Sequence, residues 1–232
     1  MCIRDSTEPS ARNAALIAYN IKIDFVKAFE HFELYLSVAS TEDNKHEAEL
    51  GTLRSAYRMG NTGGVYAAGE RVIKNPKSTK PEKAEAHYCI AKLAFEDRTF
   101  DKARAAFNKV IRLTEDERAA EARYMIAYIY YLERDLEIAE ELCLQTNQQI
   151  VGYEYWLAKS VLLLADIFIE KGDTFNAKAS LESIVDNYSG DQTILNAAKA
   201  KLKKIKENST KSSRIKPTPD ANADLEVEEE DN

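Results

Sequence analysis

The sequence predicts an all-α solenoid built from about five helix pairs. Three observations lead to this prediction. The pattern Phe-x-x-Ala-x-x-x-Phe occurs twice, starting at Phe25 and at Phe100. Small residues recur in the same register along the chain, each on an amphipathic stretch. A second amphipathic stretch precedes each of them, across a short segment containing Gly, Asn or Asp. Repetition of such a unit is typical of a helical array.

Each repeat is anchored on the small residue of the pattern, in the second helix of its pair. The anchors are Ala28, Val65, Ala103, Ala139 and Ala177, so their spacings are 37, 38, 36 and 38 residues. Four residues after the anchors stand Phe32, Gly69, Phe107, Cys143 and Leu181. Seven residues after them stand Tyr35, Val72, Val110, Thr146 and Ile184. Positions i, i+4 and i+7 share one face of a helix, so we expect this face to be buried.

The first helix of each pair has its own small contact point. Twelve residues before the anchors stand Leu16, Leu53, Ala91, Ala127 and Ala165. Nine residues before them stand Tyr19, Ala56, Ala94, Tyr130 and Phe168. Turn-forming residues separate the two helices, and in the second unit we assign Gly63 and Gly64 to the turn because glycine commonly ends helices.

This arrangement resembles the tetratricopeptide repeat, a helix-turn-helix unit of about 34 residues. Ala91, Ala103 and Phe107 match its pattern best. The resemblance covers residues 9–188, in units 9–42, 46–78, 81–115, 117–150 and 152–188. It implies a right-handed solenoid whose first helices line a concave groove. The units are longer than the family's, and its usual Trp and Pro are absent, so we expect longer loops or an extra helical turn.

The two ends of the chain differ from the repeats. Residues 1–6 resemble the translation of a sequencing adapter, so we leave 1–6 out of the fold prediction. Residues 190–207 have helical periodicity with many lysines and predict a capping helix. Residues 208–232 lack apolar periodicity and end in an acidic run, which predicts a disordered tail. Residues 155–188 also resemble the last repeat of large bacterial envelope-associated proteins of this family. That resemblance implies the C-terminal part of a longer bacterial protein, in the periplasm or cell envelope.

Composition excludes several classes of function. A pI near 5.2 argues against nucleic acid as the main partner. No apolar run is long enough to span a membrane. Cys89 and Cys143 stand apart on different repeats, which is typical of small apolar core residues. Glu85, His87 and Cys89 cannot chelate one metal because positions i and i+2 diverge on a helix. We find no catalytic motif and no cofactor-binding or metal-binding motif, and so expect no enzyme activity.

The remaining candidate is a protein-binding groove formed by first-helix residues. Its predicted members are Arg54, Tyr57, Arg58, Tyr88, Lys92, Phe95, Tyr124, Tyr128, Tyr131 and Asp166. Tyr124, Tyr128 and Tyr131 stand at i, i+4 and i+7 and so form one stripe. Tyrosine suits binding surfaces because it presents a large area with a polar tip. The alternative is that these rings pack against the next repeat. The Lys/Asn pair with which some family members grip a C-terminal carboxylate has no counterpart here.

The leading functional hypothesis is a non-catalytic scaffold that binds a partner peptide or helix in a Tyr-rich, partly cationic groove. A second hypothesis makes the chain the interaction module of a larger protein whose activity (enzymatic, envelope assembly or signalling) lies upstream. A third is self-association through the N-terminal edge of the array. The identity of the partner does not follow from the sequence.

Overall fold

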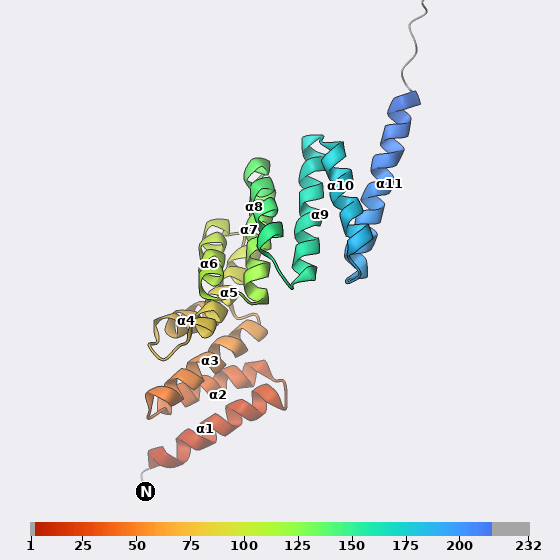
Figure 1. Ribbon diagram of the computed structural model, residues 1–232. Coiled ribbons are helices and arrows are strands. Elements are labelled where there is room, and N and C mark those ends of the chain that lie inside the picture. The colour runs from red at the N-terminus through yellow and green to blue at the C-terminus, as the bar shows by residue number, and fades with distance from the viewer. Residues whose placement is uncertain (1–2, 215–232) are drawn as a thin grey trace, which may run out of the picture.

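The computed structural model describes the backbone of residues 3–214 and the side chains of residues 7–208. Within that part every regular element is an α-helix, which confirms the predicted all-α class (Figure 1). The helices are α1 (Ile3–Asn20), α2 (Phe25–Val38), α3 (Glu42–Arg58), α4 (Thr62–Lys74), α5 (Lys80–Glu96), α6 (Phe100–Leu113), α7 (Glu117–Leu132), α8 (Leu136–Gln149), α9 (Glu154–Lys171), α10 (Thr174–Asn187) and α11 (Gln192–Arg214).

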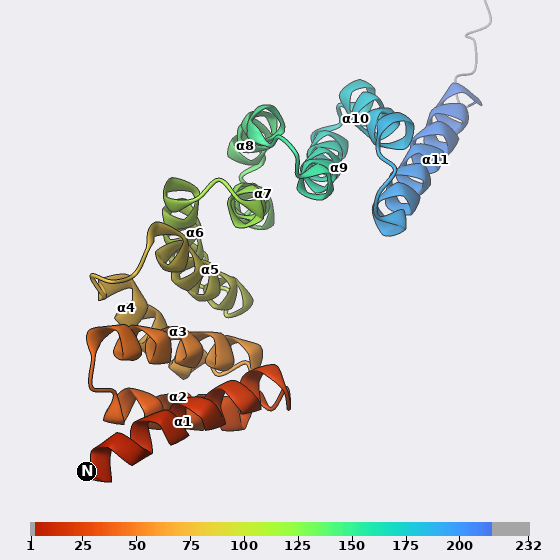
Figure 2. The same cartoon turned by 60° about the horizontal axis from the view of Figure 1, so that its bottom comes forward.

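The helices stack in chain order as a curved solenoid. Each helix packs against the one before it and the one after it. Consecutive odd-numbered helices also contact each other along the whole array, whereas no two even-numbered helices do within the described residues. In Figure 2 the odd-numbered helices from α3 onward lie on the inner side of the curve, and α4, α6, α8 and α10 lie on the outer side. The first helix of each pair therefore forms the inner face.

The core is a strip that runs through the whole stack. Each of the five anchors is completely buried, with a relative exposure of 0%, as the repeat register predicts. The larger residues four and seven positions later are buried too, among them Phe107 and Val110. A small side chain at the anchor lets the neighbouring helix approach, and the larger residues then fill the space beside it.

Gly51 in α3 marks one of the closest approaches. A Cβ atom built on Gly51 would lie 2.2 Å from Cε1 of Phe32 in α2. Gly51 is buried, and Phe32 belongs to the core between α1, α2 and α3. The Phe32 ring thus lies directly on the α3 backbone, in space that any other residue would occupy.

The turns within the five pairs share a residue with positive φ followed by an N-cap residue. The residue five positions before each anchor has a positive φ, and these residues are Ile23, Gly60, Arg98, Arg134 and Gly172. The next residue is the N-cap of the second helix, and in four of the five pairs its side chain accepts a backbone N–H bond. In the second pair the cap is Asn61, which accepts from the amide of Gly64. Assigning Gly63 and Gly64 to the turn was therefore wrong, because α4 already begins at Thr62.

The first pair departs from the predicted register. Its turn spans residues 21–24, one residue more than the turn 59–61 of the second pair. The N-cap amide of Asn61 bonds to the carbonyl of Ala56, but the corresponding amide of Asp24 bonds to Ala18. Ala15 and Ala18, both buried, thus take the places that the sequence pattern assigned to Leu16 and Tyr19, which are only partly buried.

Both ends are more helical than the sequence suggested. α1 begins at Ile3, within the segment 1–6 that resembles an adapter. The capping helix α11 buries Ile194, Ala198 and Leu202 against α9 and α10. It continues to Arg214, beyond the predicted end at residue 207, because no Gly or Pro interrupts it before Pro217. The rest of the predicted tail, residues 215–232, lies outside the described residues.

Candidate protein-binding groove

All ten candidate residues lie on odd-numbered helices. Three are on α3, three on α5, three on α7 and one, Asp166, on α9. These helices contact one another in chain order and lie on the inner side of the curve, so all the candidates come from the helices of one continuous inner face. We call this face the inner groove.

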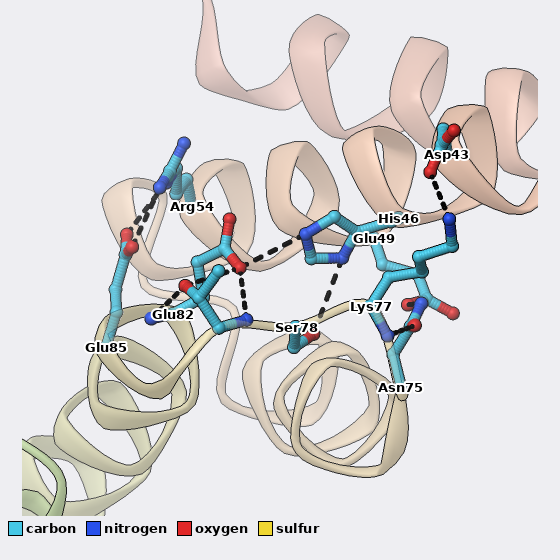
Figure 3. Close-up of polar contacts among 10 residues, drawn as sticks. Asp43, His46, Glu49, Arg54, Asn75, Lys77, Ser78, Glu82 and Glu85 are labelled. Atoms are coloured by element: carbon cyan, nitrogen blue, oxygen red, sulfur yellow. Dashed lines mark hydrogen bonds and ion pairs between the residues drawn. The ribbon is translucent and has the colours of Figure 1, made fainter.

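Charged residues of the inner groove pair between successive repeats. Arg54 of α3 forms a bidentate ion pair with Glu85 of α5, with N–O distances of 2.7 and 2.8 Å (Figure 3). One repeat further on, Lys92 Nζ donates to Oε1 of Glu121 at 2.7 Å, and the Tyr88 hydroxyl donates to Oε2 at 2.7 Å. Glu121 is buried, so these two donors satisfy a carboxylate that water reaches poorly.

The same pairing continues toward both ends. In the first repeats, Glu47 of α3 accepts from Arg12 of α1 at 2.7 Å and from the Tyr35 hydroxyl at 3.0 Å. The hydrogen bond from Arg12 lowers the pKa of the Glu47 carboxyl. At the other end Asp166 pairs with Lys201 of the capping helix. We call this series of inter-repeat contacts the ion-pair ladder.

A polar cluster fixes α3 against the start of α5 (Figure 3). In the His46 ring, Nε2 lies 3.2 Å from Oε2 of Glu82 and Nδ1 lies 3.4 Å from Oγ of Ser78. Glu82 also closes a capping box with Thr79 at the N-terminus of α5. Asn75, in the same connection, donates to Glu49 of α3 at 2.7 Å. This connection is the longest between two repeats, and its side chains hold it on α3.

Aromatic rings form a second continuous series on the inner groove. Phe95 of α5 lies 6.0 Å from Tyr128 of α7, and Tyr128 stacks on Tyr124 with 5.8 Å between ring centroids. Tyr124 in turn lies 5.7 Å from Trp156 of α9, which contacts Tyr155 at 4.9 Å. We call this set the aromatic run. It crosses three repeats, and such ring pairs each contribute about 0.5–1.5 kcal/mol beyond their burial.

The tyrosines differ in what they leave exposed. Tyr124 has only 7% relative exposure, so most of its ring is used in the contact between repeats, as the packing alternative anticipated. Tyr128 is partly exposed, and so is Tyr131, whose hydroxyl donates to Glu170 of α9. Burial raises the pKa of Tyr57 to about 12, and burial followed by the bond to Glu121 raises that of Tyr88 further. These hydroxyls are hydrogen-bond donors at neutral pH.

Arg58 ends α3 beside the first repeat. Its guanidinium lies 5.4 Å from the centroid of the Phe25 ring at the start of α2. A hollow of about 170 Å³ opens nearby between α1, α2 and α3. Its lining residues are Leu16, Tyr19, Asn20, Phe32, Glu47, Leu50, Gly51 and Arg54. The hollow has room for one apolar side chain.

Several groove residues were missed from the sequence. They are Glu47, Glu85, Glu121, Tyr155, Trp156, Lys159 and Glu170. One signal could have found four of them: Glu47, Glu85, Glu121 and Lys159 each precede the anchor of their repeat by 18 residues. That spacing puts them on the face of the first helix that turns toward the preceding repeat.

Metal binding, thiol reactivity and membrane crossing each place structural requirements on the described residues. Residues 7–208 contain no group of three His, Cys, Asp or Glu side chains placed to hold a metal ion. Burial raises the thiol pKa of Cys89 and of Cys143 to about 12, in agreement with their expected role as buried core residues. None of the helices described here combines the length and the apolar character needed to cross a membrane.

Comparison with known proteins agrees with this architecture. Residues 159–191 match the family model of the tetratricopeptide repeat. Among solved structures, BtubC (BKLC) from P. vanneervenii is 16% identical, with a TM-score of 0.50 over 99% of this chain and 100% of its own. The MamA protein is 15% identical, with a TM-score of 0.59 over 93% of this chain and 100% of its own. No curated protein sequence matches. The chain is thus an α-solenoid with a TPR-like fold, and its sequence matches the tetratricopeptide repeat over residues 159–191.

Proposed function

We propose that this chain is a non-catalytic protein-interaction scaffold that holds an extended peptide or a helix of its partner in the inner groove. Solenoids of this type present long concave surfaces that suit such ligands. The face is continuous over α3, α5, α7 and α9, so a ligand of several turns or a long extended segment can contact several repeats at once.

The aromatic run is the observation that carries the proposal. Phe95, Tyr128 and Trp156 of this run are partly exposed, and so is Tyr131, whose ring stacks on Tyr128, although each also packs within the array. Tyr and Trp are the residues most enriched among those that dominate binding energy, because they desolvate a large area with few rotatable bonds. No even-numbered helix carries a comparable series within the described residues.

The ion-pair ladder supports the same assignment in another way. Arg54 and Lys92 are neutralised by carboxylates of the next repeat, so their charges shape the groove without repelling or attracting ligands strongly. Apolar and aromatic contacts then supply most of the affinity, and rim charges set its orientation.

Site-directed photo-crosslinking tests the proposal. Benzoylphenylalanine is placed at Tyr128 on the inner groove or, as the matched control, at Lys178, which is exposed on the outer helix α10. After irradiation in the source cells, covalent adducts are identified by mass spectrometry. We expect a discrete protein adduct from position 128 and none from position 178. Adducts from 178 alone, or the same adducts from both positions, would contradict the groove assignment.

A further inference from the structure

The ion-pair ladder changes sign at the fifth repeat. In the second, third and fourth repeats the position 18 residues before the anchor is Glu47, Glu85 or Glu121, and each pairs with a cation of the preceding repeat. In the fifth repeat this position is Lys159. Arg54 and Lys92 occupy the partner position in earlier repeats, and in the fourth repeat this position is Tyr128, which supplies no carboxylate to pair with Lys159.

Lys159 is surrounded by aromatic rings instead of a counter-ion. Its Nζ lies 5.0 Å from the ring centroid of Tyr124, 5.9 Å from that of Tyr155 and 5.8 Å from that of Trp156. Considering only residues 7–208, no carboxylate lies within 4.0 Å of this ammonium. Rings attract a cation by about 0.5–1 kcal/mol at exposed sites, but they accept none of the strong hydrogen bonds that an ammonium donates.

Carboxylates that interact with the three rings each have a partner other than Lys159. Glu117 accepts from the Trp156 indole N–H at 3.2 Å. Glu121 is bonded on both oxygens, and Asp166 pairs with Lys201. Asp191, which feels the charge of Lys159, accepts from the amide and hydroxyl of Thr193 at 2.7 and 2.6 Å. Lys159 is therefore a half-buried cation on the inner groove whose charge is left for a ligand.

We infer that Lys159 and its three rings form an acceptor site for an aspartate or glutamate side chain of an extended partner peptide. The carboxylate forms the charge-assisted hydrogen bond that the chain itself does not supply, and apolar residues beside the acid cover the exposed faces of Tyr155 and Trp156. This inference rests on the proposed function, since it names the chemistry of the partner at the same groove.

Trp156 reports directly on this site because it is the only tryptophan of the chain. The test follows its single indole N–H signal by NMR while the full chain is titrated with a capped peptide, Ser-Gly-Leu-Glu-Leu-Gly-Ser. The control peptide carries Gln in place of Glu. We expect a saturable shift with the Glu peptide and about tenfold weaker binding of the Gln peptide. Equal affinity for the two peptides, or no shift with either, would overturn the inference.

Variants separate a local ion pair from general electrostatics. Lys159→Gln should lower the affinity for the Glu peptide about tenfold. Lys159→Arg keeps the charge and the packing of the aliphatic stem, so it should retain most of the affinity. Lys178→Gln removes the same charge from the outer face and should leave binding unchanged. A loss with Lys178→Gln as large as with Lys159→Gln would reduce the effect to net charge and refute the site.

Two further results discriminate the remaining readings. If the Gln peptide with a free C-terminal carboxylate binds as well as the capped Glu peptide, the site binds the carboxylate of a chain terminus and the side-chain assignment is wrong. If neither peptide binds while crosslinks from position 128 persist, the acceptor site at Lys159 is refuted and the proposed scaffold function is retained. If no crosslink forms from position 128 either, the proposed scaffold function of the inner groove is contradicted as well.

Discussion

Replacing Gly51 by alanine tests whether close packing of Phe32 on α3 holds the first two repeats together. A Cβ at this position would lie 2.2, 2.3 and 2.5 Å from three atoms of the Phe32 ring. Carbon atoms in contact are normally about 3.5–4.0 Å apart, so the ring must move by more than about 1 Å. Phe32 has only 3% relative exposure, so its ring can move only by displacing core neighbours or by entering the hollow that it lines together with Gly51.

Two opposing terms set the size of the effect. Alanine stabilises a helix interior by about 1 kcal/mol relative to glycine. Overpacking of a core costs about 1–3 kcal/mol, and a rigid ring at this distance corresponds to the upper end of that range. We therefore expect Gly51→Ala to lower the free energy of unfolding by about 2 kcal/mol, measured by urea denaturation followed by circular dichroism.

Gly69 provides the matched control. It is also a buried glycine inside a helix, but a Cβ there would meet the terminal Cδ1 of Ile90 at 2.9 Å, and that flexible end can rotate away. Gly69→Ala should therefore be neutral or stabilising by about 0.5 kcal/mol. Adding Phe32→Leu to Gly51→Ala should recover about 1 kcal/mol of coupling. If Gly51→Ala is as stable as the parent chain, the steric argument is refuted.

Three other expectations concern the turns, the ladder and the thiols. Ile23→Gly should stabilise the protein by about 1 kcal/mol in the same assay, because a β-branched residue is strained at a φ of 52°. Gly60→Ala should destabilise it by a similar amount, because alanine is strained at a φ of 71°. Destabilisation by Ile23→Gly or stabilisation by Gly60→Ala would contradict the shared turn geometry. Because the folded pKa of Glu47 lies below its ordinary value of 4.5, its stabilisation is present above pH 4.5 and is lost as the pH falls through the folded pKa; melting temperatures of Glu47→Gln should thus drop less on acidification than those of the parent chain. With Cys2→Ser as background, a thiol reagent at pH 8 should label neither buried cysteine until urea unfolds the chain, and rapid labelling of the folded protein would argue against their raised pKa.

The repeat architecture could be predicted because its signals are local. An anchor such as Ala103 and the residues four and seven positions later describe one helix face, which periodicity reveals without knowledge of any neighbour. The predicted register was wrong in the first pair because the turn 21–24 has one extra residue and contains no glycine that would have indicated it. It failed at Gly63 and Gly64 because the cap Asn61 decides where α4 starts, whatever the intrinsic preference of the residues after it.

The surface of the groove was harder to predict, because exposure depends on contacts between repeats. Tyr124 and Tyr128 are neighbours on one helix stripe, yet Trp156 of the next repeat covers Tyr124 and leaves Tyr128 more open. Likewise, the sequence alone suggests that Lys92 is an unpaired cation, whereas in the fold it forms an ion pair with Glu121. A one-dimensional pattern gives the face on which a side chain stands, but the neighbouring repeat determines whether that side chain remains available.

The pattern of helix contacts also has a mechanical consequence. Besides the packing of each helix on its chain neighbours, the contacts between next-nearest helices of the described residues join odd-numbered helices alone, so the solenoid has these additional contacts on its inner side. Flattening the curve must stretch the contacts that join Arg54 to Glu85 and Lys92 to Glu121, whereas tightening it does not stretch them. The molecule should therefore behave as a spring with unequal stiffness in the two directions. High salt, which screens the partly exposed pairs, should soften it most against straightening.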